Sequence, residues 1–536
     1  MATTKIALIS VYNKDGIENF AKSLVDLGWQ IISSGGTAKK LQAANIPVKD
    51  VAELVGGQAI LGHRVVTLSR ELHAGLLARQ IPEDQSEMAK LDIPYIDLVC
   101  CDFYPLKEAI NKPGATLESV IEMTDIGGPT MVRSAAKGGR IVICDPQDRN
   151  WVLEKLQTSN SLSADDIETL RAKAETLVAQ YCLDSAIFHS QKKYFGIIGQ
   201  QIKECKYGED PYLLPASLYS SPNNDSLALD KIKLIEGTDP SFINWTDIDR
   251  LLQTMTHIAA GFSYNFGQVP LLALGVKHGN TCGAAYGADP KELIKKMVLG
   301  DHLAIFGGFV MFNFELTPEL VETLLTTNMP EGQRLLLDGV IAPAISPDAV
   351  ELLKRKKDKC RVLINPALKN LDQNSLQTEL RLRQVRGGFL LQPNFTLILD
   401  FKHPELTSTS SISEDQQKDL ILAWAIGCTS NSNTTTLVKD GQLLGNGVGQ
   451  QSRVASCQLA IFRAKASNHD LTNAVAYTDS FFPFTDGPAE LAKAGIKVIF
   501  SSSGSVKDPE VQKFCQDNNI ILLQLPDKIC RGFFGH

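Results

Sequence analysis

The segment Gln30-Ile-Ile-Ser-Ser-Gly-Gly-Thr37 passes from a short apolar run into a helical pattern that extends to Ala44. A strand that leads directly into a helix is typical of α/β units. In one interpretation the loop binds a phosphate, because glycines allow close approach, hydroxyls add donors and a helix N-terminus offers free N–H groups. In the other it is only a tight turn with Thr37 as N-cap. Lys14, just past the preceding strand, favours an anion site.

The alternation of strands and helices continues through residue 145. Lys5–Val11 is an apolar strand, and Asp15–Leu27 has the apolar spacing of a helix. Further strands are expected at Tyr95–Cys101 and Arg140–Cys144, so the pattern predicts a parallel sheet covered by helices. The long helical pattern Ser163–Gln191 is expected to close this domain.

Two further αβ regions follow a stretch rich in Pro, Tyr and Ser at 206–222. The sequence predicts a first domain over 1–195, a linker over 196–222 and a second region over 223–536. That region divides into 223–380 and 381–536, which are expected to be two copies of one αβα unit. Its strands are expected at Leu271–Val276, Ala304–Phe312, Gly339–Ala342, Arg361–Ile364, Phe389–Gln392, Thr434–Val438, Ala474–Tyr477, Lys497–Phe500 and Ile520–Leu523.

The composition is that of a globular protein. Hydrophobic residues make up 44% and charged residues 21% of the 536 positions, and this length predicts two to four domains. Apolar runs are strand-sized, far below the roughly 18 to 20 residues of a membrane span. No signal peptide is apparent. The eleven cysteines contain no C-x-x-C pair, which favours a reducing compartment. A cytoplasmic protein without a membrane partner is expected.

The net charge of −7 gives no basic face for nucleic acid. Two segments nevertheless combine chemistry-bearing residues. Thr124-Asp-Ile-Gly-Gly-Pro-Thr130 is followed by Arg133 and Lys137, one helical turn apart, and this is either a substrate wall or a capped helix with a solvated basic face. Lys277-His278 ends a predicted strand before the loop 279–283. There the pair is suited to proton transfer and anion binding, or it is a chance surface pair.

Other motifs are rejected. Gly445-Asn-Gly-Val-Gly449 lacks the spacing of a dinucleotide loop, and Lys439-Asp-Gly441 is most simply a hairpin turn. A zinc deaminase would need H-x-E and P-C-x-x-C motifs, which are absent, so no metal site is predicted.

Taken in order, the motifs resemble those of the bifunctional purine-biosynthesis enzymes that join AICAR transformylase to IMP cyclohydrolase. The similarity runs nearly end to end and is carried by Ser34-Gly-Gly-Thr-Ala38, Thr124-Asp-Ile-Gly-Gly-Pro-Thr-Met-Val-Arg-Ser-Ala-Ala-Lys137, Val276-Lys-His278, Phe306-Gly-Gly308, Asp338-Gly-Val-Ile-Ala-Pro343, Ser432-Asn433, Gly449-Gln-Gln-Ser-Arg453 and Asp479-Ser-Phe-Phe-Pro-Phe-Thr-Asp486.

The resemblance implies a methylglyoxal-synthase-like N-terminal domain, then two cytidine-deaminase-like units that act as a homodimer. These units would move a formyl group from the cosubstrate 10-formyltetrahydrofolate to AICAR. His278 would accept the amine proton, while Lys277 and Asn433 would orient the reactants and stabilise the oxyanion. The folate would contact Phe481 and Asp486, and the nucleotide would contact Lys206, Tyr207, Asp338 and Arg453.

The N-terminal domain would close the ring of formyl-AICAR to give IMP, largely by proximity. The resemblance assigns the phosphate to Lys14, Ser34, Gly36, Thr37 and Arg64, with Thr67 beside them, and assigns the management of protons and carbonyl charge to Tyr104, Asp125 and Lys137. A bound monovalent cation is also possible in this family.

Several positions depart from the family pattern. Val66 stands where a catalytic lysine is expected, Tyr12 replaces a serine, Asp102 replaces an asparagine, and Gly138-Gly139 replace Asn-His. Lys206 replaces an arginine, which keeps the charge but loses a bidentate phosphate contact. The rest of that motif, to Leu213, and the C-terminal Arg531-Gly-Phe-Phe-Gly-His536 also differ. These departures predict retained formyl transfer and weak ring closure, and they leave open a degenerate nucleotide-binding paralogue with a regulatory role.

Overall fold

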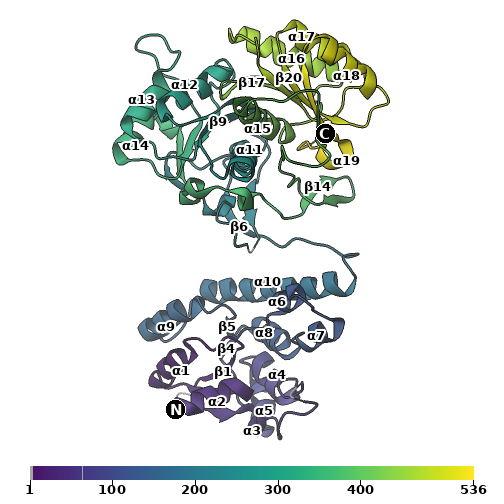
Figure 1. Ribbon diagram of the computed structural model, residues 1–536. Coiled ribbons are helices and arrows are strands. Elements are labelled where there is room, and N and C mark those ends of the chain that lie inside the picture. Colours follow the sequence, from purple (N-terminus) through teal and green to yellow (C-terminus); the bar gives the residue numbers. More distant parts are fainter. Residues whose placement is uncertain (1–3, 63, 222, 536) are drawn as a thin grey trace. The chain divides into compact units, whose positions relative to one another are not determined.

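The computed structural model describes residues 4–535 except 63 and 222 (Figure 1). The chain forms two compact units, Met1–Ile198 and Gly199–His536, and each is described by itself.

The first unit is built on a five-stranded parallel sheet with the order β3-β2-β1-β4-β5. Its strands are β1 Ile6–Ser10, β2 Gln30–Ser33, β3 Lys49–Asp50, β4 Leu98–Cys101 and β5 Ile141–Ile143. Its helices are α1 Ile17–Asp26, α2 Gly35–Ala43, α3 Val51–Leu54, α4 Arg70–Leu77, α5 Pro82–Lys90, α6 Leu106–Asn111, α7 Leu117–Glu122, α8 Gly127–Lys137, α9 Asp148–Ser159 and α10 Ala164–His189.

The sheet is buried on both faces, as a parallel sheet requires. Alternate residues of β1 point to opposite sides: Ala7 and Ile9 pack in a cluster with α1 and α9, whereas Ile6 and Leu8 pack in a second cluster with α4 and α8. The strands and helices predicted for residues 5–144 are confirmed. The alternative that made Thr37 the N-cap is wrong, because α2 begins at Gly35 and Ser34 is its N-cap.

The second unit contains a twelve-stranded mixed sheet with the order β16-β21-β20-β19-β17-β18-β10-β9-β11-β12-β13-β8. Its strands are β8 Lys233–Glu236, β9 Leu271–Lys277, β10 Asn280–Gly287, β11 Phe309–Phe312, β12 Gly339–Ala342, β13 Arg361–Ile364, β16 Thr407–Ser408, β17 Thr435–Lys439, β18 Gln442–Gly447, β19 Val475–Thr478, β20 Val498–Ser503 and β21 Ile521–Pro526.

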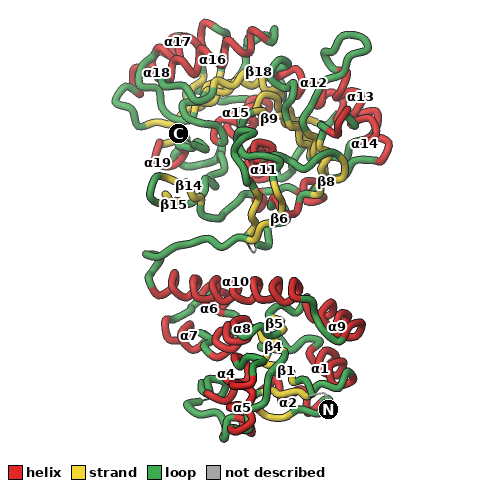
Figure 2. Tube along the Cα trace, turned by 180° about the vertical axis from the view of Figure 1, so that it is seen from behind, coloured by secondary structure: helices red, strands yellow, loops and turns green. Residues whose placement is uncertain are grey.

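The two halves of this sheet repeat one topology. Each contains an antiparallel edge strand, a hairpin and three parallel strands, and the halves meet where Ala285 pairs with Gln442. The central helices α11 Phe242–Phe266 and α15 Glu414–Cys428 lie side by side in both views (Figures 1 and 2) and share one core. The other helices are α12 Pro290–Gly300, α13 Pro318–Thr326, α14 Pro347–Leu353, α16 Arg453–Ala466, α17 Asp486–Lys493, α18 Asp508–Asp517 and α19 Asp527–Cys530. The expected duplicated αβα architecture is therefore present.

Three local expectations differ from the structure. The stretch expected to be a linker contains β6 Gln200–Glu204 and β7 Ser217–Ser220, which pair with each other. The expected loop 279–283 is mostly strand β10, because the chain reverses within two residues. The strand expected at Phe389–Gln392 exists as β15 Gly388–Gln392, but it pairs only with β14 Arg381–Val385 in a separate exposed sheet.

All eleven cysteines are free. No helix in the described part of the chain is long and apolar enough to span a bilayer.

Candidate active sites in the two units

The residues predicted for formyl transfer gather along one edge of the twelve-stranded sheet. Strand β9 ends at Lys277, and β17 begins just after Asn433. These strands run in opposite directions and are separated by β10 and β18, so the end of one and the start of the other lie at the same edge. Asp338 precedes β12 and Asp479 follows β19 at this edge too.

Lys277 and His278 lie at the turn of the β9–β10 hairpin. His278 (φ 52°) and Gly279 (φ 67°) form the turn, and Lys277 pairs with Asn280. Two successive residues with positive φ are typical of a type I′ hairpin turn, which leaves the first side chain exposed at the tip. The sequence placed His278 correctly at the end of a strand, and the hairpin explains why its ring projects from the sheet edge.

Asp247 of α11 holds this turn and was missed at the sequence level. Its Oδ1 atom accepts a hydrogen bond of 2.6 Å from the N–H of Gly279. The carboxylate is buried, and burial raises its pKa, while the bond from Gly279 opposes that shift. A buried carboxylate on the apolar helix α11 is the signal that could have identified it, because buried charges are rare unless they bond to a partner.

The lysine beside the turn has a defined position. Lys277 Nζ donates to the carbonyl oxygen of Phe306 at 2.6 Å, next to the Gly307-Gly308 turn. A Cβ atom at Gly308 would lie 2.8 Å from the carbonyl oxygen of Val276, so only glycine fits there. Asp338 is tied to the same turn by its N–H bond to Gly308 O at 2.9 Å. Lys277, His278 and Asp338 thus form one group at the ends of β9 and β12, the two strands that flank β11.

Asn433 belongs to a second group at the same edge. Its Nδ2 atom donates to Gln450 O at 2.8 Å, and the two backbones exchange hydrogen bonds of 3.1 Å. The fully buried Asp479 accepts bonds from the Ser432 hydroxyl at 2.5 Å and the Thr434 N–H at 2.9 Å, on either side of Asn433. The Asn433 side chain is therefore presented by a loop that is fixed at three points.

Arg453 takes a different position from the one expected. Its guanidinium is buried and forms an ion pair with Asp479, and it also donates to the Thr478 hydroxyl at 2.7 Å. The charge of Arg453 therefore lies inside the protein, where it neutralises Asp479. The guanidinium does not extend into an open nucleotide pocket. Phe481 is half-buried and Asp486 is exposed at the N-terminus of α17, so both follow β19 at the same edge.

The C-terminal residues brace the Asn433 loop. Phe534 N–H donates to Ser430 O at 2.8 Å, and Ser432 N–H donates to Gly535 O at 3.1 Å. The Phe534 ring lies between the guanidinium groups of Arg250 and Arg381, at 3.6 and 3.5 Å. The extra residue in the C-terminal motif is thus accommodated in an ordered segment.

The two groups are separated along the sheet edge. Between β9 and β17 there are three strand spacings, about 14 Å. Lys206 is exposed, and the carbonyl oxygen of Tyr207 accepts the N–H of Phe242 at the start of α11. The predicted residues are therefore spread over several strands of the sheet edge.

In the first unit the candidate site lies at the carboxyl ends of the strands, where open α/β sheets bind ligands. The strand order reverses between β1 and β4, and the residues after these strands include Tyr12 and Asp102. The N–H groups of Tyr12 and Asn13 donate to the Asp102 carboxylate, the second at 3.2 Å. Burial raises the pKa of Asp102, and these two bonds oppose the rise. Asp102 therefore fixes the loop that carries Lys14.

The Gly-Gly loop and Lys14 are neighbours, as predicted. A Cβ atom on Gly36 would lie 3.3 Å from Lys14 Cε and 3.7 Å from its Nζ. Gly35 has a φ of 50° and is the first residue of α2. The unpaired N–H groups of the first turn of the helix therefore lie within this loop. The Thr37 hydroxyl forms its hydrogen bonds with the backbone of Val11. It accepts the N–H of Val11 at 3.1 Å and donates to the Val11 carbonyl oxygen at 3.0 Å. Thr37 can therefore offer a ligand only its backbone N–H.

Tyr104 and Asp125 lie near this edge. The ring of Tyr104 packs edge-on against Tyr12 at 5.6 Å, and both side chains are about half exposed. Asp125 Oδ1 accepts the N–H of Gly128 at 2.9 Å at the start of α8. Burial raises the pKa of Asp125, and backbone hydrogen bonds counter that shift. The buried hydroxyl of Thr67 lies so close to Gly127 that a Cβ atom there would be 2.6 Å away.

Other predicted residues do not join this group. Lys137 ends α8, ten residues after Gly127 and about 15 Å along the helix. Arg133 is exposed and pairs with Glu175 at 3.6 Å, as the solvated-face interpretation expected. Arg64 pairs with Glu122 at 2.6 Å on the surface. Val66 is half-buried against the core cluster that includes Leu72.

One departure from the family pattern has a steric reason. A Cβ atom at Gly138 would lie 1.9 Å from the carbonyl oxygen of Leu76. The chain therefore cannot place the expected asparagine there unless α4 moves.

Comparison with known proteins agrees with this architecture. The MGS-like domain model matches residues 16–130, and the AICARFT/IMPCHase bienzyme model matches residues 135–463. The bifunctional purine biosynthesis protein PurH of Aquifex aeolicus is 34% identical over 96% of this chain and 98% of that protein. PurH of Caldicellulosiruptor saccharolyticus is 34% identical over 97% and 98%, and PurH of Neisseria meningitidis is 33% identical over 98% and 98%. A crystal structure of ForH covers 36% of this chain and 100% of its own, at 33% identity and a TM-score of 0.32. By its match to the bienzyme model and to these relatives along nearly its whole length, this chain belongs to the AICARFT/IMPCHase bienzyme family of purine biosynthesis.

Proposed function

We propose that this chain catalyses two consecutive steps of IMP synthesis. The second unit transfers the formyl group of 10-formyltetrahydrofolate to the 5-amino group of AICAR, and the first unit closes formyl-AICAR to IMP. The observation that carries the first step is the exposed His278 at a rigid turn, with Lys277 beside it and Asn433 at the same sheet edge.

In the transfer step the AICAR amine nitrogen attacks the formyl carbon. His278 accepts the amine proton as the new C–N bond forms. The ammonium of Lys277 stabilises the oxyanion of the tetrahedral intermediate. Asn433, just before a strand that lies about 14 Å away along the sheet edge, is assigned to orienting the reactants. The bond from the formyl carbon to folate nitrogen then breaks, and that nitrogen takes up a proton. The pterin is assigned to Phe481 and Asp486, and the nucleotide to Lys206, Tyr207 and Asp338.

In the ring closure the carboxamide nitrogen of formyl-AICAR attacks its own formyl carbon. One water molecule leaves as the ring forms, so the enzyme mainly holds the reacting groups together. The loop Ser34–Thr37 and Lys14 are assigned to the phosphate, and Tyr104 and Asp125 to proton movement. Since Val66 supplies no charge, we expect this step to be slow in the wild-type chain.

The proposal includes a homodimer, a cytosolic location and a monovalent cation that supports the second unit. The 14 Å separation of the two groups is consistent with a site that a second copy completes. The cation is inferred from the resemblance alone, and exchange of potassium for tetramethylammonium in the assay would test it.

The transfer step is tested by supplying AICAR and 10-formyltetrahydrofolate and following tetrahydrofolate release. Replacement of His278 by Ala should lower kcat about 10²-fold or more. His403→Ala is the matched control, because within the described residues the His403 ring forms one hydrogen bond, accepting the N–H of Glu405 at 3.1 Å. Absence of wild-type turnover would refute the transfer step and would favour the nucleotide-binding alternative.

A further inference from the structure

The helix α11 carries two charged side chains three residues apart, Asp247 and Arg250, and this spacing places them on one face of the helix. Asp247 holds the turn that contains His278, through the 2.6 Å bond that it accepts from Gly279. Arg250 contacts the segment that braces the other group at the sheet edge, because its guanidinium lies against the ring of Phe534. One turn of α11 is thus connected to both parts of the candidate site.

The ring of Phe534 is held between two guanidinium groups. The Cζ atoms of Arg250 and Arg381 lie 3.6 and 3.5 Å from the ring centroid. Arg250 is 7% exposed, and its Nη1 atom is buried without a hydrogen-bond partner in the described part of the chain. A buried cation needs a compensating group, and the ring supplies one because its face is the negative end of the aromatic quadrupole. The contact therefore depends on an aromatic side chain.

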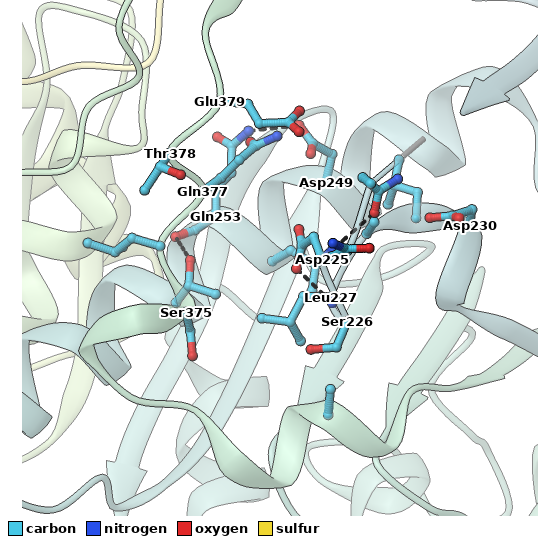
Figure 3. Close-up of a pocket in the computed structure, with 18 of the residues that line it drawn as sticks. Asp225, Ser226, Leu227, Asp230, Asp249, Gln253, Ser375, Gln377, Thr378 and Glu379 are labelled. Atoms are coloured by element: carbon cyan, nitrogen blue, oxygen red, sulfur yellow. Dashed lines mark hydrogen bonds between the residues drawn. The ribbon is translucent and has the colours of Figure 1, made fainter. Parts of the chain in front are cut away.

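An acidic cavity of about 620 Å³ lies beside the two arginines. Asp249 and Gln253 of α11 line it together with residues 375–379, which lead into β14 (Figure 3). Burial lowers the pKa of Arg250 to about 10, and the Asp249 carboxylate limits that fall, so Arg250 remains charged at neutral pH. The negative lining favours two cations on one ring. It has no Lys, Arg or His among the described residues and contains the carboxylates of Asp225, Asp230, Asp249, Asp372 and Glu379.

Phe534 connects this anchor to the loop that carries Asn433. Its N–H donates to the carbonyl oxygen of Ser430 at 2.8 Å, and the carbonyl oxygen of Gly535 accepts the N–H of Ser432 at 3.1 Å. Ser432 directly precedes Asn433 in the chain. A displacement of the Phe534 ring therefore moves the backbone from which the Asn433 amide projects.

We propose that Arg250 and Phe534 are positioning residues for formyl transfer, whose stacked contact fixes the Asn433 loop relative to the His278 turn. Asp247 and Arg250 then set the separation of the two groups from a single helix. Phe534 lies in the C-terminal motif that is one residue longer than the family pattern, so the anchor is a feature of this chain. The kinetic part of this inference rests on the proposed function, whereas the mobility of the loop is measured without substrate.

The kinetic test removes the ring face and keeps the apolar bulk. Phe534→Leu should lower kcat for formyl transfer about tenfold or more, because a small misplacement of a positioned group costs rate steeply. The KM for AICAR should change less, since the nucleotide is assigned to residues beside His278. Phe534→Trp keeps an aromatic face and should recover most of the rate. Phe266→Leu is the matched control, because that ring also faces a cation, Lys418 Nζ at 5.4 Å, at the other end of α11.

A double-mutant cycle tests whether the two residues act through one contact. Arg250→Met removes the charge and keeps much of the side-chain length. If the stacked contact is the common cause, the double variant with Phe534→Leu should be about as slow as the slower single variant. Losses in kcat that multiply would mean that the two residues act separately and would overturn the proposal.

Amide hydrogen exchange follows the loop independently of turnover. A peptide that covers residues 430–434 should exchange about tenfold faster or more in Phe534→Leu than in the wild type, since local opening becomes easier. Phe534→Trp should keep the wild-type rate, and strand β20 should be unchanged in both variants. Unchanged exchange in Phe534→Leu, or equal acceleration in the Leu and Trp variants, would overturn the proposal. A loop that Phe534→Leu loosens in a chain without wild-type transferase activity would instead reject the proposed function and leave the anchor standing.

Discussion

The Oδ1 atom of Asp247 accepts a 2.6 Å hydrogen bond from the N–H of Gly279, the residue that follows His278 in the turn between β9 and β10. The bond joins a buried carboxylate of the central helix α11 to the tip of a hairpin at the sheet edge. The position of His278 is thus set from a segment about thirty residues earlier in the chain.

Replacing Asp247 by Ala should lower kcat for formyl transfer about ten- to a hundredfold, because a misplaced catalytic group loses rate steeply. The KM for AICAR should change less, since Asp247 acts through the turn and does not contact the substrate. Asp247→Asn keeps an acceptor oxygen for Gly279 and should recover much of the rate. Steady-state kinetics of all three proteins check this. Equal losses in the Ala and Asn variants would mean that the charge matters, not the turn.

Replacing Val66 by Lys should raise IMP formation from formyl-AICAR by about 10²-fold, the lower end of typical general acid–base effects. Val66 is half-buried at the margin of the core, and a lysine stem can lie along apolar surface while its ammonium extends outward. Val66→Met controls for side-chain length. The result is read as IMP absorbance with purified formyl-AICAR. If wild-type turnover is already near a typical kcat of about 10 s⁻¹ and lysine adds nothing, a lysine is not needed here.

Asp125 should give ring closure an acidic limb at a higher pH than an ordinary aspartate would, because burial raises its pKa. If its ionised form is the active one, kcat/KM rises with pH through that raised value, and Asp125→Asn removes the limb. A limb that persists in Asp125→Asn would assign it to another group.

The same shift predicts an effect on stability. Since the folded pKa is raised, the contribution of Asp125 is fully present below the unfolded pKa of about 3.9 and is lost as the pH rises through the folded value. As the pH rises across this range, the free energy of unfolding in urea should therefore decrease less for Asp125→Asn than for the wild type. A parallel pair of curves would contradict the assignment.

Replacing Arg453 by Met should destabilise the second unit by roughly 3 to 5 kcal/mol, because the buried charge of Asp479 would lose its cationic partner. The two side chains are 6% and 0% exposed. Arg334→Met is the matched control, since its ion pair with Glu322 is 45% and 47% exposed and should contribute less than about 1 kcal/mol. Guanidinium unfolding measures both. Equal effects at the two sites would show that the buried pair has no special role.

Local sequence patterns were sufficient for most elements of the first unit. The apolar run Ile6–Ser10 and the helical spacing of Ile17–Asp26 depend on residues close in the chain, so periodicity reports them directly. The predictions failed where the hydrogen-bond partners of a segment lie far away in the sequence. The segment 279–283 reads as a loop, but residues 280–283 begin strand β10 because β9 supplies hydrogen-bond partners along it and β18 pairs with the strand farther on, at Ala285. Phe389–Gln392 reads as one of the strands of the second region, and it is exposed because β14 is the one strand that pairs with it in the described part of the chain.

The Gly-Gly loop, Lys14 and the Lys277-His278 pair were found from sequence because each is a short motif at the end of a strand, and strand ends of one sheet meet at a common edge. The sequence by itself thus determined the fold class, the family and the chemical groups that the chain offers. Only the tertiary structure decided that Arg453 turns inward to Asp479, that Thr37 binds Val11, that Lys137 lies at the far end of α8, and that Asp247 holds the His278 turn. The physical reason is that a charged or polar side chain takes the nearest partner that offsets its burial, and that partner is set by packing between segments far apart in the chain.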